Sequence, residues 1–218
     1  LRESVPDCYA DLGYRTVSTN PCGEIPLCPY DSCRLLAINL YSYVVNPFKP
    51  DAYFDFDLFK KHVALAQRIM DDIIDLELEK IERIMAKIDS DPENEDVKHT
   101  ESVLWQKIYK KSGQGRRTGV GITAEGDMLA ALGLRYGTEE ATEFAEKVHQ
   151  TVALSAYRSS VEMAKERGAF EVYDSEREKN NPFINRLREA DPELYEEMKK
   201  YGRRNIACLT IAPTGTTS

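Results

Sequence analysis

The spacing of apolar residues predicts helices as the dominant elements of this chain. The clearest pattern runs from about 57 to 89, where apolar side chains recur at helical spacing and charged ones cover the other face. Asp55 or Asp57 could cap the start of this stretch, which predicts one long helix or two successive ones. A polar break at 90–102 then precedes a shorter helix, which we expect around 103–111.

Glycines and alternating residues predict the elements that follow. A short strand over 118–122 turns into a helix that ends near Gly133. A longer helix runs from about 138 to 167, where Gly168 stops it. Three further glycines depart from the dinucleotide-binding spacing and are interpreted as turn and close-packing positions: Gly115, Gly119 and Gly121.

The last quarter of the chain predicts two short helices and a strand. The pairs Asn181-Pro182 and Asp191-Pro192 are typical of helix starts. Residues 205–212 have the pattern of a buried strand. Strands that alternate with helices in this way indicate an α/β sheet whose strand ends feed loops.

A proline-rich loop dominates the N-terminal part. Residues 14–19 predict a short strand that leads into this loop. The loop itself runs from Asn20 to Ser32, and four of its residues forbid regular helix and most sheet pairing: Pro21, Gly23, Pro26 and Pro29. Residues 35–45 are mostly apolar and fit either a buried strand or a helix, because periodicity does not separate the two in so short a run.

Composition is that of a soluble globular protein. The chain has 218 residues, 42% hydrophobic and 30% charged, which argues for one packed unit and against disorder. The formal net charge of −8 argues against a nucleic-acid partner, because phosphate contacts need an excess of Lys and Arg. The sequence has neither an apolar run of about 18 residues nor the layout of a signal peptide, so we expect no membrane association and a cytoplasmic protein.

The five cysteines are too sparse for a secreted disulfide scaffold. Cys22, Cys28 and Cys33 could bind a metal ion, but their separations of six and five residues do not match the short CxxC pairs of zinc sites, and no histidine lies nearby. We therefore expect no metal site. Cys28 and Cys208 fit small hydrophobic residues, and Cys8 has no assigned role.

Cys22 has surroundings that favour chemistry. In an extended loop alternate side chains share a face, so Asn20, Cys22 and Glu24 would converge on one ligand. A nearby carboxylate disfavours a thiolate nucleophile, and no histidine is close to Cys22 in sequence. A thiol that reacts by losing a hydrogen atom needs no thiolate, and Glu24 could then act as a base toward a substrate hydroxyl.

Three motifs resemble the large, catalytic subunit of ribonucleotide reductases. The first is NPCGE, followed by Cys33 eleven residues after Cys22 and then by LLAINL. The last is LTIAPTGTTS, and RRTGVGITAEGDML lies between the two. The resemblance covers nearly the whole chain and implies a fragment of a ten-stranded α/β barrel. Residues 1–218 would be one partial, helix-rich catalytic domain, with a central finger loop at about 20–33.

The resemblance also implies roles for individual residues. Cys22 matches the cysteine that becomes a thiyl radical and abstracts the ribose 3′ hydrogen, and Glu24 matches the general base at the 3′ hydroxyl. Asn20 matches the amide that hydrogen-bonds the ribose hydroxyls. Cys33 matches one member of the redox pair that ends as a disulfide, and its partner is expected upstream of this chain.

The C-terminal motif matches the family's loop for the substrate phosphate: Pro213, Thr214, Gly215, Thr216, Thr217 and Ser218. Glycine and hydroxyl residues after a strand can bind phosphate through backbone N–H groups and hydroxyls. The motifs look most like the class II enzymes, which implies adenosylcobalamin as cofactor. The implied partners are a ribonucleoside di- or triphosphate, a thioredoxin-type reductant and, because a partial barrel exposes apolar surface, a second copy of the chain.

Two other classes of function remain open from sequence. One is a metal-binding or interaction module without catalytic activity that uses Cys22, Cys28 and Cys33. The other is a fragment of a glycyl-radical enzyme, which would need a C-terminal glycine segment that these residues do not contain. We expect the isolated chain to be catalytically incompetent.

Overall fold

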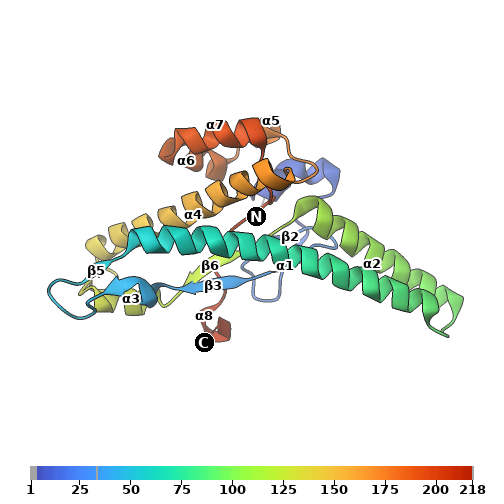
Figure 1. The fold of residues 1–218 in the computed structure, drawn as a ribbon, viewed down its shortest axis with the longest axis horizontal. Coiled ribbons are helices and arrows are strands. Elements are labelled where there is room, and N and C mark those ends of the chain that lie inside the picture. The colour runs from blue at the N-terminus through green and yellow to red at the C-terminus, as the bar shows by residue number, and fades with distance from the viewer. Residues whose placement is uncertain (1–3, 33, 218) are drawn as a thin grey trace.

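The computed structural model describes residues 4–32 and 34–217 and shows long helices lying across a small set of strands (Figure 1). Helices α1 and α4 lie side by side and pack against one another, and α2 returns along the far half of α1. In chain order the elements are η1 (Val5–Leu12), β1 (Ser18–Thr19), β2 (Pro26–Leu27), β3 (Leu36–Asn39), η2 (Leu40–Tyr43), β4 (Val44–Val45), β5 (Tyr53–Phe54), α1 (Phe56–Ser90), α2 (Glu95–Gly115), β6 (Val120–Thr123), α3 (Glu125–Ala131), α4 (Glu139–Arg167), α5 (Ser175–Glu178), α6 (Pro182–Ala190), α7 (Pro192–Tyr201) and α8 (Thr214–Thr217).

Two parallel strands form the centre of the fold. β3 pairs with β6 in a register that sets Leu36 opposite Val120 and Asn39 opposite Thr123. The long connection between them contains α1 and α2, as expected for a parallel crossover. The expected strand at 118–122 is therefore confirmed, with a shift of two residues at its start, and the apolar stretch at 35–45 contains strand β3, the short helix η2 and strand β4.

The segment 205–212 runs beside β6, but the expectation of a regular strand there is wrong. Its one bridge is between Val120 and Leu209. The carbonyls of the successive residues Ala207 and Cys208 accept hydrogen bonds from the N–H groups of Thr118 and Val120. A regular strand directs only alternate residues to the same neighbour, so this pair of successive bonds interrupts the ladder.

Helix α1 is a single helix, which decides between the two possibilities that the sequence left open. Asp55 caps it by accepting a hydrogen bond from the N–H of Leu58 at 2.9 Å. Its buried side includes Phe59, Val63 and Met70, which belong to the hydrophobic core between α1, α4 and the strands.

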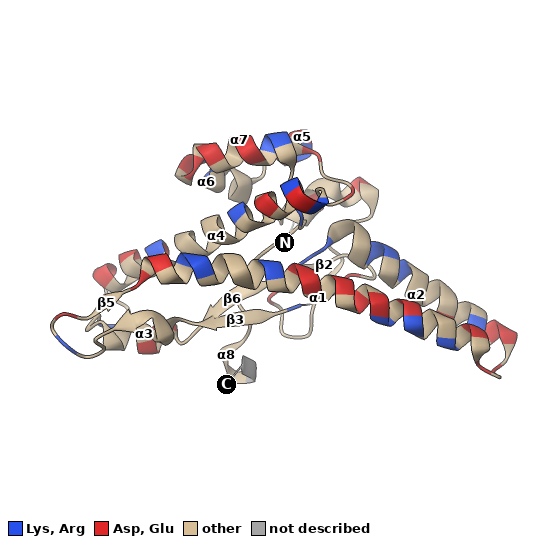
Figure 2. Cartoon of the chain, in the orientation of Figure 1, with Lys and Arg blue, Asp and Glu red and all other residues tan. Residues whose placement is uncertain are grey.

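Helix α2 begins earlier and is longer than the sequence predicted. Asn94 caps it by accepting a hydrogen bond from the N–H of Asp96, and Glu95 and Asp96 occupy the first turn, where acidic residues are favourable. The polar stretch interpreted as a break is therefore mostly helix. Along 75–96 exposed acidic residues lie on α1 and the turn into α2 (Figure 2), as is typical of a solvated helical face.

Helices α4, α6 and α7 begin at the predicted residues. The Thr138 hydroxyl caps α4, and α4 ends at Arg167, directly before Gly168. Asn181 and Asp191 cap α6 and α7, each with a proline in the first turn. These boundaries depend on local capping chemistry, and the sequence therefore contained the information that sets them.

Glycines allow the strands and the N-terminal segment to approach closely, as predicted. A Cβ on Gly121 would lie 2.0 Å from the backbone oxygen of Thr210, and one on Gly119 would lie 2.5 Å from that of Arg34. On Gly115 it would lie 2.8 Å from the ring of Tyr14. Within the described ranges, no helix combines the length and the apolar character that a membrane span requires.

Candidate active site

The cysteine loop is a hairpin whose turn is held together by Asn20. β1 pairs antiparallel with β2, so Pro26 takes part in sheet pairing that we had expected prolines to prevent. This is possible because β2 is an edge strand of a two-stranded pair. The Asn20 backbone N–H donates to the Ile25 carbonyl at 3.1 Å, the Ile25 N–H donates to Asn20 Oδ1 at 2.9 Å, and the Gly23 N–H donates to the Asn20 carbonyl at 3.0 Å.

This turn places the three predicted site residues in different surroundings. Gly23 has φ +84° and the chain reverses over 21–24, so the extended geometry that would put alternate side chains on one face is wrong here. The Asn20 side chain is buried, with 6% of the residue exposed, whereas Cys22 is exposed. Glu24 alone of the three lines a cavity of about 250 Å³.

The carboxylate of Glu24 is the unusual group at this site. Both of its oxygens are buried, and neither has a hydrogen-bond partner in the described part of the chain. Burying a charged or polar group without a partner is costly, and native proteins rarely do so without a functional reason. The cavity beside it is also lined by Arg117, Tyr157 and Cys208. A ligand with a hydroxyl group could satisfy this carboxylate.

An ion pair that the sequence did not reveal fixes the far end of the loop. Arg117 Nε donates to Asp31 Oδ2 at 2.6 Å, and both side chains are at most 5% exposed. The carbonyl of Arg117 in turn accepts a hydrogen bond from Arg34 at 2.9 Å, and Arg34 also pairs with Glu77 of α1. The loop is thus tied to the segment before β6 and to α1 by buried charges. The only sequence signal was the pair of arginines before β6, whose partners lie far away in the chain.

Cys28 and Cys208 are both buried, which confirms the expectation that they are small hydrophobic residues. Burial and the nearby Asp31 raise the pKa of Cys28 to about 12. Burial likewise raises the pKa of Cys208 to about 12. Burial raises the pKa of the partly buried Cys8. Cys33, predicted as the redox cysteine, lies outside the described residues.

The predicted phosphate loop lies at the short helix α8, directly after the segment 205–212. Pro213 is partly buried, and Thr214 and Gly215 are exposed. Thr216 and Thr217 belong to the same helical turn, and Ser218 lies outside the described residues. The segment therefore follows strand-like backbone that hydrogen-bonds to β6, which is the position the sequence predicted.

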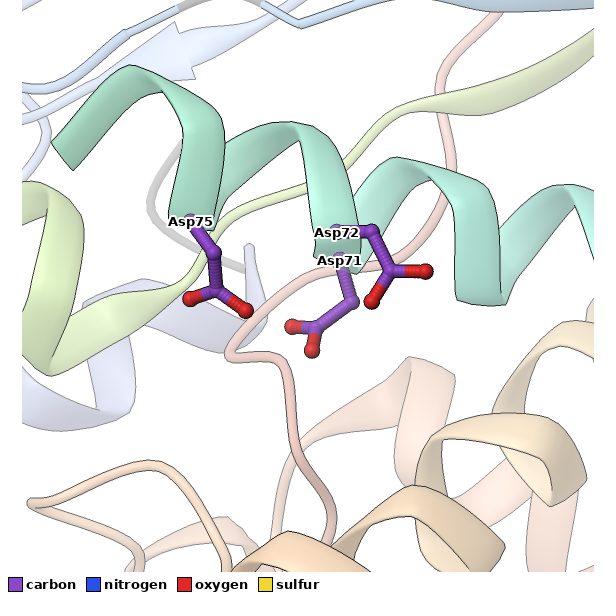
Figure 3. Close-up of side chains that lie close together, drawn as sticks. All are labelled: Asp71, Asp72 and Asp75. Atoms are coloured by element: carbon purple, nitrogen blue, oxygen red, sulfur yellow. The ribbon is translucent and has the colours of Figure 1, made fainter. Parts of the chain in front are cut away.

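One group of carboxylates has the proximity of a metal site, but it does not include cysteine. Among the described residues, Asp71, Asp72 and Asp75 of α1 bring one oxygen each within 4.8 Å of one another (Figure 3). Cys22 and Cys28, two of the three cysteines considered above as metal ligands, are not members of this group. Cys22 is exposed, and Cys28 is buried beside Asp31.

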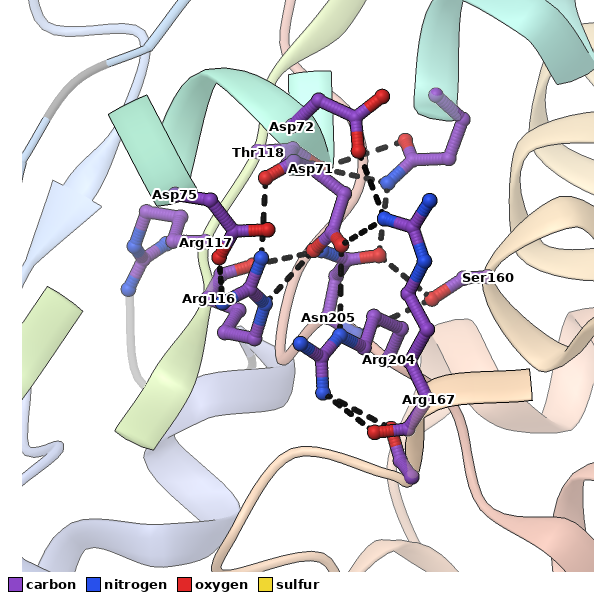
Figure 4. A network of polar contacts seen from close by, with 12 residues as sticks. Asp71, Asp72, Asp75, Arg116, Arg117, Thr118, Ser160, Arg167, Arg204 and Asn205 are labelled. Atoms are coloured by element: carbon purple, nitrogen blue, oxygen red, sulfur yellow. Dashed lines mark hydrogen bonds and ion pairs between the residues drawn. The ribbon is translucent and has the colours of Figure 1, made fainter. Parts of the chain in front are cut away.

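Arginines already neutralise these three carboxylates (Figure 4). Arg116 donates to Asp71 and Asp75 at 2.8 Å each, and Arg167 donates to Asp72 at 2.7 Å. The fully buried Asp71 also accepts hydrogen bonds from Arg204 at 3.3 Å and from Asn205 at 2.9 Å. We interpret this cluster as a structural network that joins α1 and α4 to the segment before residue 206.

Known proteins with similar sequences and folds agree with this architecture. Residues 12–218 match the ribonucleotide reductase barrel domain. A vitamin B12-dependent ribonucleoside-diphosphate reductase of Thermoplasma acidophilum is 35% identical over 202 residues, which are 92% of this chain and 20% of that protein. The Mycobacterium tuberculosis (strain H37Rv) protein of the same name is 30% identical over 205 residues, 94% of this chain and 22% of the relative.

The fold has a counterpart among solved structures. The alpha subunit of the class Id ribonucleotide reductase of Actinobacillus ureae aligns with a TM-score of 0.62 and 20% identity, and the match covers 98% of this chain and 31% of that subunit. This likeness shows that the helices and parallel strands are part of an α/β barrel. The chain spans about a fifth of the length of the two curated relatives. By the match of its sequence to the barrel domain over nearly its whole length, the chain belongs to the ribonucleotide reductase large-subunit family, with most similarity to class II members.

Proposed function

We propose that this chain forms part of the active-site barrel of an enzyme that reduces ribonucleotides to deoxyribonucleotides. The observation that carries the proposal is the buried Glu24 carboxylate without a partner, two residues from the exposed thiol of Cys22 on one rigid hairpin. A cavity of about 250 Å³ is slightly below the ~300–1,000 Å³ typical of small-molecule sites, which suits a sugar better than a whole nucleotide.

In the proposed reaction, the Cys22 sulfur, as a thiyl radical, takes the hydrogen atom from C3′ of the ribose. Glu24 takes the proton of the 3′ hydroxyl, and the 2′ hydroxyl leaves as water. Two thiols give a proton to the departing hydroxyl, a hydrogen to C2′ and the two electrons, and they become a disulfide. Glu24 then returns its proton to the 3′ oxygen, and Cys22 returns a hydrogen atom to C3′. We assign one of these thiols to Cys33 and place the other outside this chain. Loss of hydroxide from an unactivated sugar carbon is difficult, and a radical on the neighbouring carbon makes it feasible.

Asn20 has a part in both structure and binding under this proposal. Its backbone and Oδ1 maintain the turn that presents Cys22, and its amide is assigned to the ribose hydroxyls. The segment Pro213 to Ser218 is assigned to the substrate phosphate. We treat residues 1–218 as one partial catalytic domain, with the finger loop at about 20–33.

The relatives named as vitamin B12-dependent enzymes favour adenosylcobalamin as the source of the radical. When bound, this cofactor supplies a carbon radical that takes a hydrogen atom from a thiol. The exposed position of Cys22 fits that requirement, and we assign no residue of this chain to holding the cofactor. We further propose that a thioredoxin-type protein reduces the disulfide after each turnover. The protein is proposed to be cytoplasmic and to associate as two copies.

Reduction of CDP and CTP, measured with and without adenosylcobalamin, tests this function in the full-length product of the gene that encodes this chain. We expect Cys22→Ser and Glu24→Gln to abolish turnover, and Cys8→Ser, a substitution of a partly buried cysteine in η1, to retain it. Turnover by the Cys22→Ser protein would refute the radical role. Activity without cobalamin would refute only the cofactor.

A further inference from the structure

A second cavity lies at the carboxyl ends of the two central strands. Its volume is about 360 Å³, and it shares no lining residue with the cavity beside Glu24. β3 and β6 run parallel and both point toward α3, so the loops after them meet at this end of the sheet (Figure 1). In parallel α/β folds, barrels as well as open sheets, ligands commonly bind at the carboxyl ends of the strands. The cavity is lined by Asn39, Tyr41, Phe48, Ala124, Asp127 and Ala130.

Two lining residues have a backbone conformation that is unfavourable for residues other than glycine. Phe48 has φ +62° and Ala124 has φ +60°. The Phe48 N–H donates to the carbonyl of Ala131 at 2.8 Å, which fixes this loop against α3. Despite this fixed backbone, Phe48 is 71% exposed. Strained backbone that presents an exposed aromatic ring is typical of ligand-binding positions.

Tyr41 and Phe48 form a tilted aromatic pair at the cavity, and their rings are slightly closer than two rings that flank a third. The ring centroids of Tyr41 and Phe48 lie 6.5 Å apart, with an angle of 41° between the planes. A flat ring stacked on both sides needs about 7 Å between its neighbours, twice the van der Waals separation of carbon atoms. Both rings are exposed, so to flank a planar ligand they must separate by about half an ångström and turn toward parallel on the solvent side, where no packed core opposes the movement.

The polar groups of the cavity suit a neutral ring with both donors and acceptors. Asn39 Oδ1 accepts a hydrogen bond from the Tyr41 N–H at 3.0 Å, which leaves the amide NH₂ as a donor. Asp127 is exposed, and its carboxylate has no ion pair or hydrogen bond with any residue in 4–32 or 34–217, so it offers acceptors. Its negative charge disfavours a phosphate at the same place.

We propose that this cavity binds a purine base, stacked between Tyr41 and Phe48. The N–H groups of the base donate to Asp127, and an acceptor of the ring receives the amide hydrogen of Asn39. Stacking on aromatic side chains and hydrogen bonds to base edges are the two interactions by which proteins bind unpaired bases. The proposal rests on this cavity alone and does not depend on the function assigned to the Glu24 cavity.

Titration of the chain with guanosine, adenosine and ribose, followed by ligand-observed NMR and calorimetry, tests this site. We expect at least one purine nucleoside to bind and ribose not to bind. Loss of one stacking ring in Phe48→Ala should weaken binding by about tenfold or more, and Phe48→Tyr should retain it. Tyr136→Ala is the matched control, because Tyr136 is 78% exposed and lies outside the cavity lining.

Two further variants separate this site from the cavity beside Glu24. Tyr41→Ala should weaken purine binding as much as Phe48→Ala does. If Phe48→Ala does not fold, as judged by its circular dichroism spectrum, Tyr41→Ala replaces it in the test. Glu24→Gln should leave purine binding unchanged. The proposal is overturned if neither purine nucleoside binds, if ribose binds equally well, or if folded Phe48→Ala and Tyr41→Ala variants bind like the unmodified chain. Loss of binding in Glu24→Gln alone would also overturn it. These experiments measure binding and not turnover, so their outcome is independent of the test of the proposed function.

Discussion

Replacing Glu178 with glutamine tests whether one buried ion pair, between α5 and Arg203, stabilises the fold. The Glu178 carboxylate accepts hydrogen bonds from both terminal nitrogens of Arg203, at 2.5 and 2.7 Å, and from the Tyr9 hydroxyl at 2.6 Å. The side chains of Arg203 and Glu178 are 0% and 2% exposed. The rings of Phe170 and Tyr173 flank the guanidinium at 5.3 and 5.6 Å.

The expected cost is large because Glu178→Gln leaves the Arg203 charge buried without its counter-ion. Removing one partner of a buried ion pair typically costs ~3–5 kcal/mol. That is a large share of the ~5–15 kcal/mol by which a domain is stable. At about 2–4 °C per kcal/mol for a chain of this size, the melting temperature should fall on the order of 10 °C. Tyr9→Phe removes the hydrogen bond to the Glu178 carboxylate and the weaker contacts of the hydroxyl with the Asp174 backbone, at 3.2 and 3.3 Å, and should cost less, about 1.5–3 kcal/mol.

Urea unfolding followed by circular dichroism measures these differences. The matched control is Asp11→Asn, which breaks the exposed pair between Asp11 and Arg177, with contacts of 2.6 and 3.0 Å. Water already solvates that pair, so we expect no measurable change. If Glu178→Gln unfolds at the same urea concentration as Asp11→Asn, the buried pair does not stabilise the fold and the reasoning is refuted.

Two further predictions concern close packing and thiol reactivity. Gly121→Ala should destabilise the fold by ~1–3 kcal/mol, because the new Cβ would lie 2.0 Å from the Thr210 backbone oxygen. Gly126→Ala is the control and should not destabilise it, because a Cβ there would have no atom within 4 Å. Equal urea midpoints of the two variants would contradict this prediction. Iodoacetamide should label Cys22 quickly and leave Cys208 unlabelled from pH 7 to 9, because burial raises the pKa of Cys208 to about 12 and keeps it a protonated thiol throughout that range. Mass spectrometry after brief labelling checks this, and comparable labelling of the two cysteines would contradict it.

Local chemistry explains which elements could be predicted from sequence. The starts of α1, α4, α6 and α7 depend on a capping residue and the first helical turn, and each was found within a residue or two. The start of α2 was missed because its polar residues resembled a loop, although Asn94 followed by Glu95 and Asp96 is a capping pattern.

Long-range contacts explain what could not be predicted. The segment 205–212 has the apolar pattern of a strand, but its irregular hydrogen bonds depend on its position beside β6. Ala207 bonds to Thr118, 89 residues earlier, and Cys208 bonds to Val120, 88 residues earlier. Motif resemblance identified the family. It did not predict that the turn at Gly23 would separate the side chains of Asn20 and Cys22.

The two carboxylates of the finger loop show how the structure distinguishes a supporting residue from a candidate catalytic one. Asp31 forms an ion pair with Arg117, whereas Glu24 lines the same cavity as Arg117 and its carboxylate has no hydrogen-bond partner among the described residues. A buried carboxylate that serves stability is expected to have a partner, as Asp31 does. Glu24 faces the same arginine-lined cavity without one, and folding alone gives no reason for that arrangement. We therefore propose the unpaired carboxylate as the group that binds a substrate hydroxyl, and the paired one as the group that keeps the loop in place.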